Sequence, residues 1–306
     1  MLHKIQIIAV LIALLMVVAP AQAYFKDLGV GARPLGMGGA YVATADDGNA
    51  VLWNASGLAQ LDRHEITTMF AALYAGLEAK LYNEKTDLLG YHFVGYVYPS
   101  LWGSFALSWN TFQSQVYDES TLCLSYGGKL KESIYAGLNL KRQGWSVGGN
   151  EFTRLDRDIP DQGTSRSGFT ADLSALYKAT DRFSLGVSAE NLLPADVGLN
   201  TKENIPINLR GGIAYILRNP RAELLSALDI TYREGDGANV HIGVESWFFH
   251  RAVAARAGWN LTSAAAGFSY CVTKGWAEMQ LDYAFVYPTS IQETYGSHRM
   301  SMSVRF

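Results

Sequence analysis

Hydrophobic and polar residues alternate along most of the chain from residue 64 to its last residue. At the end of the chain, for example, Met300, Met302, Val304 and Phe306 are separated by single polar or charged residues. Successive side chains of a β-strand point to opposite faces, so each such segment predicts a strand with one apolar and one polar face.

The alternation predicts fourteen strands, most of about ten residues, which is the length that a tilted strand needs to cross a bilayer. The expected strands span residues 64–76, 89–98, 101–110, 118–127, 132–143, 166–178, 182–191, 205–217, 222–232, 238–249, 251–260, 262–272, 275–285 and 296–306. The second and third of these segments alternate less regularly than the others.

The connections between the expected strands are alternately short and long. The long ones span residues 77–88, 144–165, 192–204 and 286–295. Short turns at one end and long loops at the other are typical of an outer-membrane barrel, with the turns periplasmic and the loops external. An even number of strands also returns the C-terminus to the periplasmic side.

Aromatic residues gather near the expected strand ends, as they do in the interface girdles of membrane barrels. These residues are Tyr98, Trp102, Trp109, Tyr126, Tyr177, Tyr215, Trp247, Trp259, Trp276 and Tyr287. The sequence therefore predicts an all-β protein, a 14-stranded antiparallel transmembrane β-barrel in the outer membrane of a Gram-negative-type bacterium. A secreted, soluble β-sandwich or propeller also alternates and remains the alternative.

Residues 1–23 have the pattern of a secretory signal peptide. His3 and Lys4 form a positive head, Ile5–Val18 is almost entirely apolar, and Ala21-Gln22-Ala23 is an A-x-A cleavage pattern. The alternative is an uncleaved membrane anchor, for which this apolar run is short.

Residues 24–63 do not alternate and are rich in glycine, which permits tight backbone folding where side chains do not fit. Apolar residues such as Met37 and Trp53 require burial, so this segment predicts a plug that folds into the barrel of residues 64–306. The alternative is a periplasmic tail.

A short helix is expected within this plug segment. Asp46 or Asp47 is the expected N-cap, the helix runs through Trp53, and Gly57 is the expected stop signal.

The composition narrows the possible functions. The 306 residues carry 25 Lys and Arg against 28 Asp and Glu, a formal charge of -3, which gives no basic patch for nucleic acid. Hydrophobic residues make up 49%, which excludes a disordered chain. Cys123 and Cys271 fall on strands far apart around the wall, so we expect two separate thiols rather than a disulfide.

Charged residues on the polar faces are expected to point into the lumen. They are Lys141, Asp172, Glu190, Arg210, Asp229, Glu245, Arg256, Glu278, Asp282, Arg299 and Arg305. Because both signs occur in similar number, a network of ion pairs across the lumen is the favoured interpretation. A charge-selective conduit, the alternative, would need one sign to dominate.

No motif for catalysis, cofactor binding or metal binding is found, and we expect no enzyme activity and no cofactor. The sequence lacks H-E-x-x-H, a P-loop and G-x-S-x-G. Ser297 and His298 near Asp282 suggest a hydrolase only weakly, because alternation places the serine and histidine on opposite faces. A Ca²⁺ site among the aspartates of the 144–165 loop is a similarly weak alternative.

The N-terminal segment resembles the signature of the PorV/PorQ family and of the wider FadL-like outer-membrane proteins. The similarity lies in Gly31–Ala43, Ala45–Asp47 and Leu52–Leu58, where Ala55 and Ser56 replace the proline and alanine of the usual Asn-Pro-Ala-Gly-Leu. The motif residues are Gly36, Met37, Gly38, Gly39, Asp46, Asp47, Asn54 and Gly57. Stretches that resemble the PorV/PorQ branch in particular are Ala189–Leu192, Ile205–Pro206, Leu209–Gly212, Arg256–Trp259, Leu281–Phe285 and His298–Phe306.

This resemblance implies a fourteen-stranded barrel with an N-terminal plug and one of two functions. PorV-like proteins are accessories of type IX protein secretion, and this is the expected function, with loop 144–165 as the candidate surface for secretion-system proteins. FadL-like proteins admit long-chain fatty acids or other hydrophobic compounds, which leave through a gap in the wall. Gly95, Gly103 and Gly211 are candidate positions for such a gap.

Further partners are expected from the barrel itself. They are outer-membrane lipid around the wall and the barrel-assembly machinery, which would read the apolar residues Met302, Val304 and Phe306 of the C-terminal strand as an assembly signal.

Overall fold

The computed structural model describes residues 25, 28–77, 89–149, 153, 159, 164–291 and 293–306. The expected signal peptide over residues 1–23 lies outside these residues, as do Asp156, Asp158 and Asp161 of the 144–165 loop.

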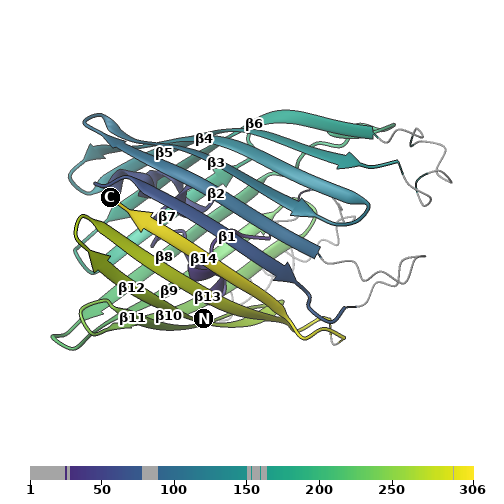
Figure 1. Ribbon diagram of the computed structural model, residues 1–306. Coiled ribbons are helices and arrows are strands. Elements are labelled where there is room, and N and C mark those ends of the chain that lie inside the picture. The colour runs from purple at the N-terminus through teal and green to yellow at the C-terminus, as the bar shows by residue number, and fades with distance from the viewer. Residues whose placement is uncertain are drawn as a thin grey trace, which may run out of the picture.

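Fourteen antiparallel strands form a closed barrel in which β1 pairs with both β2 and β14 (Figure 1). The strands are β1 Glu65–Leu73, β2 Leu89–Ser100, β3 Gly103–Gln113, β4 Tyr117–Lys131, β5 Ile134–Val147, β6 Thr164–Lys178, β7 Phe183–Glu190, β8 Asn208–Arg218, β9 Ala222–Arg233, β10 Gly237–Phe248, β11 Val253–Asn260, β12 Ser263–Lys274, β13 Ala277–Pro288 and β14 Ser297–Arg305. The expected fold class is thereby confirmed, and the sandwich and propeller alternatives are wrong.

Most strand ends lie within a few residues of the predicted ones, with exceptions that have local causes. β1 ends at Leu73 rather than at residue 76, because the backbone of Tyr74 takes a positive φ of 50°. β8 begins only at Asn208, because Pro206 has no N–H to contribute to a ladder. Ile205, the first residue of the expected strand, is instead 3% exposed and packs with Trp145 and Val197 inside the barrel.

The expected docking surface on loop 144–165 needs a correction. β5 continues to Val147, and Trp145 is a strand residue that points inward with 4% of its surface exposed. Its indole nitrogen donates a hydrogen bond of 2.8 Å to the carbonyl oxygen of Val197. Trp145 is therefore part of the interior and does not offer an external surface.

None of the three glycines proposed to mark a gap interrupts the wall. Gly95 pairs with Thr67 and Ser108, Gly103 pairs with Ser100, and Gly211 pairs with residues of both β7 and β9. A glycine keeps its backbone N–H and C=O, so the ladder continues across it.

The outer and inner faces of the wall differ sharply. Large apolar side chains cover the outside, among them Phe70, Leu124, Leu140 and Met300, each more than half exposed. Inward-facing positions alternate with them and are buried. A closed barrel satisfies its backbone hydrogen bonds without free edges, so this apolar exterior is compatible with a lipid environment.

In the part of the chain that the structure describes, three short helices precede the strands and lie within the barrel (Figure 1). The α-helix α2 (Ala32–Gly36) contacts β11 to β14, and the 3₁₀-helix η1 (Ala55–Gln60) contacts β3 to β6 on another part of the wall. The α-helix α3 (Ala50–Trp53) packs against η1. No helix of the described chain has the length and hydropathy needed to cross a bilayer.

The predicted caps of the inner helix are wrong. Asn49 takes the N-cap position of α3 and makes no side-chain cap hydrogen bond. Asp47 instead accepts two hydrogen bonds from Asn49, each of 2.9 Å, one from its backbone and one from its side chain. Gly57 lies inside η1 and does not end a helix. Its role is close packing, because a Cβ there would lie 1.9 Å from the carbonyl oxygen of Ala45.

Candidate functional site: the interior of the barrel

Residues 28–63, which we call the inner segment, fill the middle of the barrel. Met37, Tyr41 and Val51 have no exposed surface. At Gly38, φ is +67°, and a Cβ would lie 2.5 Å from the backbone nitrogen of Trp259. A left-handed backbone and a wall this close both require glycine, so the glycine-rich sequence allows the segment to lie directly against the strands.

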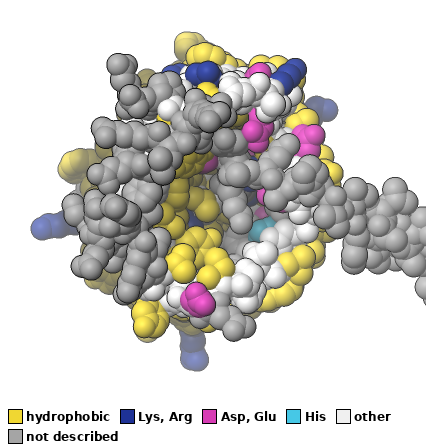
Figure 2. Space-filling view, turned by 90° about the vertical axis from the view of Figure 1, so that its right-hand side faces the viewer, with side chains coloured by type: hydrophobic (Ala, Val, Ile, Leu, Met, Phe, Trp, Pro, Cys, Tyr) yellow, Lys and Arg dark blue, Asp and Glu magenta, His cyan; other side chains and the backbone are white. Residues whose placement is uncertain are grey.

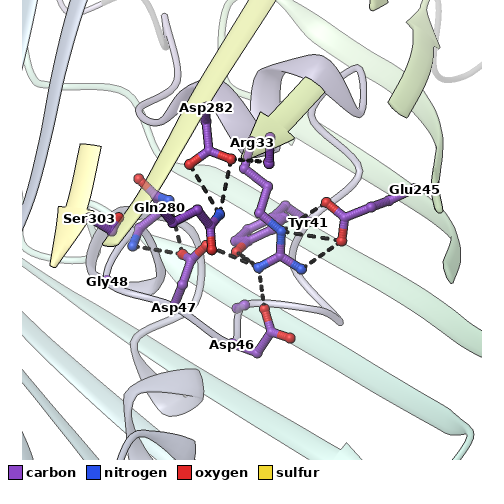
Figure 3. Close-up of polar contacts among 12 residues, drawn as sticks. Arg33, Tyr41, Asp46, Asp47, Gly48, Glu245, Gln280, Asp282 and Ser303 are labelled. Atoms are coloured by element: carbon purple, nitrogen blue, oxygen red, sulfur yellow. Dashed lines mark hydrogen bonds and ion pairs between the residues drawn. The ribbon is translucent and has the colours of Figure 1, made fainter. Parts of the chain in front are cut away.

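Arg33 is the centre of the contacts that hold the inner segment (Figure 3). Its side chain is 4% exposed and forms ion pairs of 2.6 Å with Asp46, 3.0 Å with Asp47 and 2.9 Å with Glu245 on β10. Two of these carboxylates belong to the segment itself and the third belongs to the wall. The guanidinium thus folds the segment upon itself and fastens it to the barrel. We call these four residues and Tyr41 the Arg33 cluster.

The titration behaviour within the segment favours this arrangement. Burial raises the pKa of the Tyr41 hydroxyl well above its usual value, so Tyr41 stays neutral and accepts a hydrogen bond of 3.1 Å from Arg33. Burial alone would raise the pKa of Asp46, but the Arg33 guanidinium outweighs burial and holds this pKa below its usual value. Asp46 is therefore ionised at neutral pH, as its ion pair requires.

The Arg33 cluster continues into the wall through a second arginine. Glu245 pairs with Arg256 at 3.0 Å, and Arg256 pairs with Asp282 at 3.2 Å. Trp247 donates a hydrogen bond of 2.8 Å to Glu245 and is 3% exposed. The prediction that Trp247 belongs to the outer aromatic girdle is therefore wrong.

The other charged residues expected in the lumen also have partners inside the barrel. The pairs are Lys141 with Asp172 at 2.7 Å, Arg210 with Glu190 at 2.6 Å, Arg305 with Glu278 at 2.6 Å, and Arg305 with Glu65 at 3.0 Å. These pairs join residues of the wall, rather than crossing an open lumen.

Two of the expected luminal charges bind the backbone of the inner segment. Asp229 accepts hydrogen bonds of 2.6 Å and 2.8 Å from the N–H groups of Tyr41 and Val42. Arg299 donates hydrogen bonds of 2.9 Å and 3.1 Å to the carbonyl oxygens of Leu28 and Gly29. Wall charges therefore satisfy backbone groups of a segment that has little regular structure.

Asn54, the asparagine of the expected motif, joins the segment to a different part of the wall. Its side-chain nitrogen donates to the carbonyl oxygen of Val42 at 2.8 Å and to that of Ala175 on β6 at 3.2 Å. Its side-chain oxygen accepts from the N–H of Ser56 at 3.2 Å. The remaining motif glycines pack closely, since a Cβ at Gly36 would meet Arg256 and one at Gly39 would meet His241.

A cavity of about 440 Å³ lies on the loop side of the inner segment. Its lining includes Leu35 and Trp53 from the segment and Asn239 and His241 from β10. The guanidinium of Arg210 lies over the Trp53 ring, 4.7 Å from its centroid. Figure 2 shows the same end of the barrel as a hollow with hydrophobic side chains along part of it.

Two cavities of about 290 and 330 Å³ lie on the turn side and share the lining residues Arg251, Glu278 and Arg305. They have no lining residue in common with the cavity that contains Trp53. Arg33 itself lines one of them. The inner segment therefore separates a loop-side space from a turn-side space.

The expected assembly signal lies at the barrel seam. Met302 points outward and is 39% exposed, Val304 also lies on the outward face, and the Phe306 ring stacks on His64. Two backbone hydrogen bonds of 3.0 Å and 2.9 Å join His64 and Phe306. The last residue thus helps to close β14 onto β1.

The weak hydrolase pattern does not form a site. Ser297 is buried on the inner face, and its hydroxyl accepts from the N–H of Tyr74 at 3.0 Å. His298 lies on the outward face and contacts the Tyr283 hydroxyl at 2.7 Å. Cys123 and Cys271 are separate free thiols, as expected.

Sequence reasoning missed three residues that organise the interior, namely Arg33, Glu65 and His241, whereas Trp53 was expected to be buried and is 3% exposed. A feature of the sequence could have identified Arg33, because it is a lone charged residue in a glycine-rich stretch that was expected to be buried. Glu65 had a weaker one, since it precedes an apolar position at the start of the first strand.

No protein-family model matches the sequence, and no curated protein matches it. Solved structures match over almost the whole chain. The toluene transporter TbuX of Ralstonia pickettii has a TM-score of 0.61 and 12% identity, with 90% of this chain and 97% of that chain covered. The CymD monoaromatic hydrocarbon channel has a TM-score of 0.63 and 12% identity, covering 92% and 97%.

A FadL homologue of Pseudomonas aeruginosa has a TM-score of 0.56 and 12% identity, covering 95% of this chain and 99% of that chain. Identities this low establish a common fold and do not carry over residue roles. The chain therefore shares the architecture of FadL-like barrels, a closed fourteen-stranded wall with short helices near the N-terminus.

Proposed function

We propose that the protein is an outer-membrane channel for small hydrophobic compounds. The observation that carries this proposal is the inner segment, held by the Arg33 cluster between a loop-side and a turn-side space. Similar folds include proteins described as a toluene transporter and a monoaromatic hydrocarbon channel, which supports this class of compound. No enzymatic role and no cofactor are proposed.

The size of the loop-side cavity supports this assignment. A protein cavity of about 150 Å³ is sufficient to hold benzene. The cavity next to Trp53 measures about 440 Å³, and Leu28, Leu35 and Leu261 contribute apolar surface to it. A compound with one aromatic ring would fit, and the polar side chains of the same cavity would exclude bulk hydrocarbon.

The proposed route runs along the lumen, past the inner segment. The strand ladders at the three glycine positions are continuous, so these positions give no route through the wall. Passage then requires the segment to shift. Its polar attachments to the wall are ion pairs and hydrogen bonds, which can exchange partners as the segment moves.

The expected role in protein secretion has less support. The similar structures reported above are transport proteins, and none is a PorV or PorQ protein. Trp145, which lies within the loop expected to contact secretion-system proteins, is buried. The proposed partners are therefore outer-membrane lipid and hydrophobic small molecules. We also propose that the barrel-assembly machinery recognises Met302, Val304 and Phe306 at the end of β14.

Filling the loop-side cavity is expected to slow uptake. Asn239 faces the cavity, so Asn239→Trp adds a large ring to it. Val240 is the next residue on the same strand and faces outward, so Val240→Trp is the matched control. Uptake is measured with the hydrophobic dye N-phenyl-1-naphthylamine and with radiolabelled toluene, in cells whose outer membrane otherwise excludes the dye.

The expected result is faster uptake in cells with the wild-type protein than in cells without it, and a severalfold loss with Asn239→Trp only. Uptake that does not differ between cells with and without the protein would overturn the proposed function. Equal uptake by the two tryptophan variants would show that the cavity is not on the route.

A further inference from the structure

The outward face of the barrel wall carries very little charge. Among the strands that the structure describes, Arg142 on β5 is the one arginine at an outward-facing position. The other arginines of the strands lie at inward-facing positions, many of them in the ion pairs described above. An arginine at the middle of a lipid-facing wall costs about 2–4 kcal/mol, and this cost falls to about 0–1 near the interface.

The strand register shows where Arg142 lies relative to the apolar exterior. Trp109, Leu122, Arg142 and Phe169 form one row across β3 to β6, with apolar neighbours on both sides of the arginine. Phe169 is 71% exposed.

The next row toward the loops is entirely polar or small, and consists of Thr111, Ser120, Gly144 and Ser167. The row after it begins with Gln113 and contains Asp118, Ser146 and Ser165. The exterior therefore changes from apolar to polar immediately beyond Arg142. In the outer membrane, where we place the barrel above, such a boundary lies at the level of the lipid headgroups on the loop side.

Arg142 lies at the edge of a groove on this boundary. The groove has a volume of about 320 Å³, and hydroxyl groups of both polar rows line it, together with Asp118, Glu119 and Arg166. The guanidinium donates one hydrogen bond of 3.0 Å, to the hydroxyl of Ser167. Within the described part of the chain Arg142 has no ion pair, so most of its donors face the groove or solvent.

We propose that this groove binds the phosphate group of a phosphorylated glycolipid of the outer leaflet. Arg142 would pair with the phosphate, the Ser120 and Ser167 hydroxyls would contact the sugar, and acyl chains would lie along Trp109 and Phe169. Arginine is well suited to this task because its donors match phosphate oxygens in pairs. Asp118 lies two rows beyond Arg142. Its carboxylate would repel a second phosphate at this position, so the sugar of the glycolipid is expected there. The proposal rests on the outer-membrane location proposed above.

The test is native mass spectrometry of the purified full chain in detergent, titrated with bis-phosphorylated lipid A. We expect one bound lipid A per barrel and a loss of affinity of about tenfold or more in Arg142→Ala, because a charge-assisted contact is removed. Arg142→Lys should retain part of the affinity. Arg218→Ala, which removes an exposed arginine at the turn-side end of β8, is the matched control and should bind like the wild type.

Comparison lipids identify the source of the phosphate. Dephosphorylated lipid A should bind the wild type as weakly as intact lipid A binds Arg142→Ala. Equal binding of lipid A by the wild type and Arg142→Ala would overturn the site. Equal affinity for phosphatidylglycerol, or displacement by inorganic phosphate at the same concentration as the lipid, would overturn the assignment to a glycolipid.

The dye uptake assay separates this inference from the proposed function. Arg142 lies on the outer wall, so Arg142→Ala should take up N-phenyl-1-naphthylamine at the wild-type rate. A barrel that binds lipid A through Arg142 but transports no dye would support the lipid site and contradict the channel.

Discussion

Replacing Arg33 with methionine is expected to lower the free energy of unfolding by about 3–5 kcal/mol, because removing one member of a buried ion pair leaves its partner charges uncompensated. Arg33 is 4% exposed, and Asp47 and Glu245 are 2% and 1% exposed, so these two carboxylates have little access to water once the guanidinium is removed. Methionine keeps much of the length of the side chain while removing its charge. The measurement is reversible urea unfolding in detergent micelles or vesicles.

Arg218→Met is the control for this substitution. Arg218 is 50% exposed and pairs with Glu223 at 2.7 Å, and exposed pairs of this kind contribute about 0–1 kcal/mol. A loss of less than 1 kcal/mol in Arg33→Met, no larger than in the control, would mean that the Arg33 cluster does not hold the inner segment.

Deleting residues 28–61 is expected to turn a closed barrel into an open pore. Barrels of eight strands are filled by their own side chains, and those of sixteen to eighteen leave an aqueous channel. Fourteen strands lie between these limits, and here the inner segment occupies the space. Single-channel recording in planar bilayers should show conductance steps that the intact protein lacks.

The deletion must first be shown to retain its strands by circular dichroism. Asp229→Leu is a milder variant that removes the acceptor of two backbone hydrogen bonds from the segment. It should give intermittent steps rather than a permanent opening. A deletion variant that is folded but conducts no more than the intact protein would show that the segment does not obstruct the lumen.

Much of the wall could be predicted from the sequence because alternation is a local signal. Within each strand, the alternation alone indicates which side chains point outward. In β14 this alternation is clear over only nine residues. The ends of the strands were harder to predict, because they depend on single backbone features such as the positive φ of Tyr74 and the missing N–H of Pro206. The length of β5 beyond residue 143 was missed because Gly144 and Ser146 are polar or small on the outer face.

The interior could be predicted only in part, because its contacts join distant parts of the chain. The alternation of polar and apolar residues predicted that residues such as Asp229 point inward. The high glycine content predicted that the inner segment folds into the barrel. Nothing local indicates that Arg33 meets Glu245, which lies 212 residues further along the chain. Asp47 was misjudged as a helix cap for the same reason, since its partner Arg33 comes from an earlier turn of the segment.

We propose that the apolar outer face lies in lipid while the inner segment occupies a space that lipid does not reach. Single-tryptophan variants that retain either Trp109, outward and 46% exposed, or Trp53, inward and 3% exposed, test it in vesicles of brominated phospholipid. We expect strong quenching of Trp109 fluorescence by the brominated acyl chains and little quenching of Trp53. Equal quenching of the two, or none of Trp109, would contradict it.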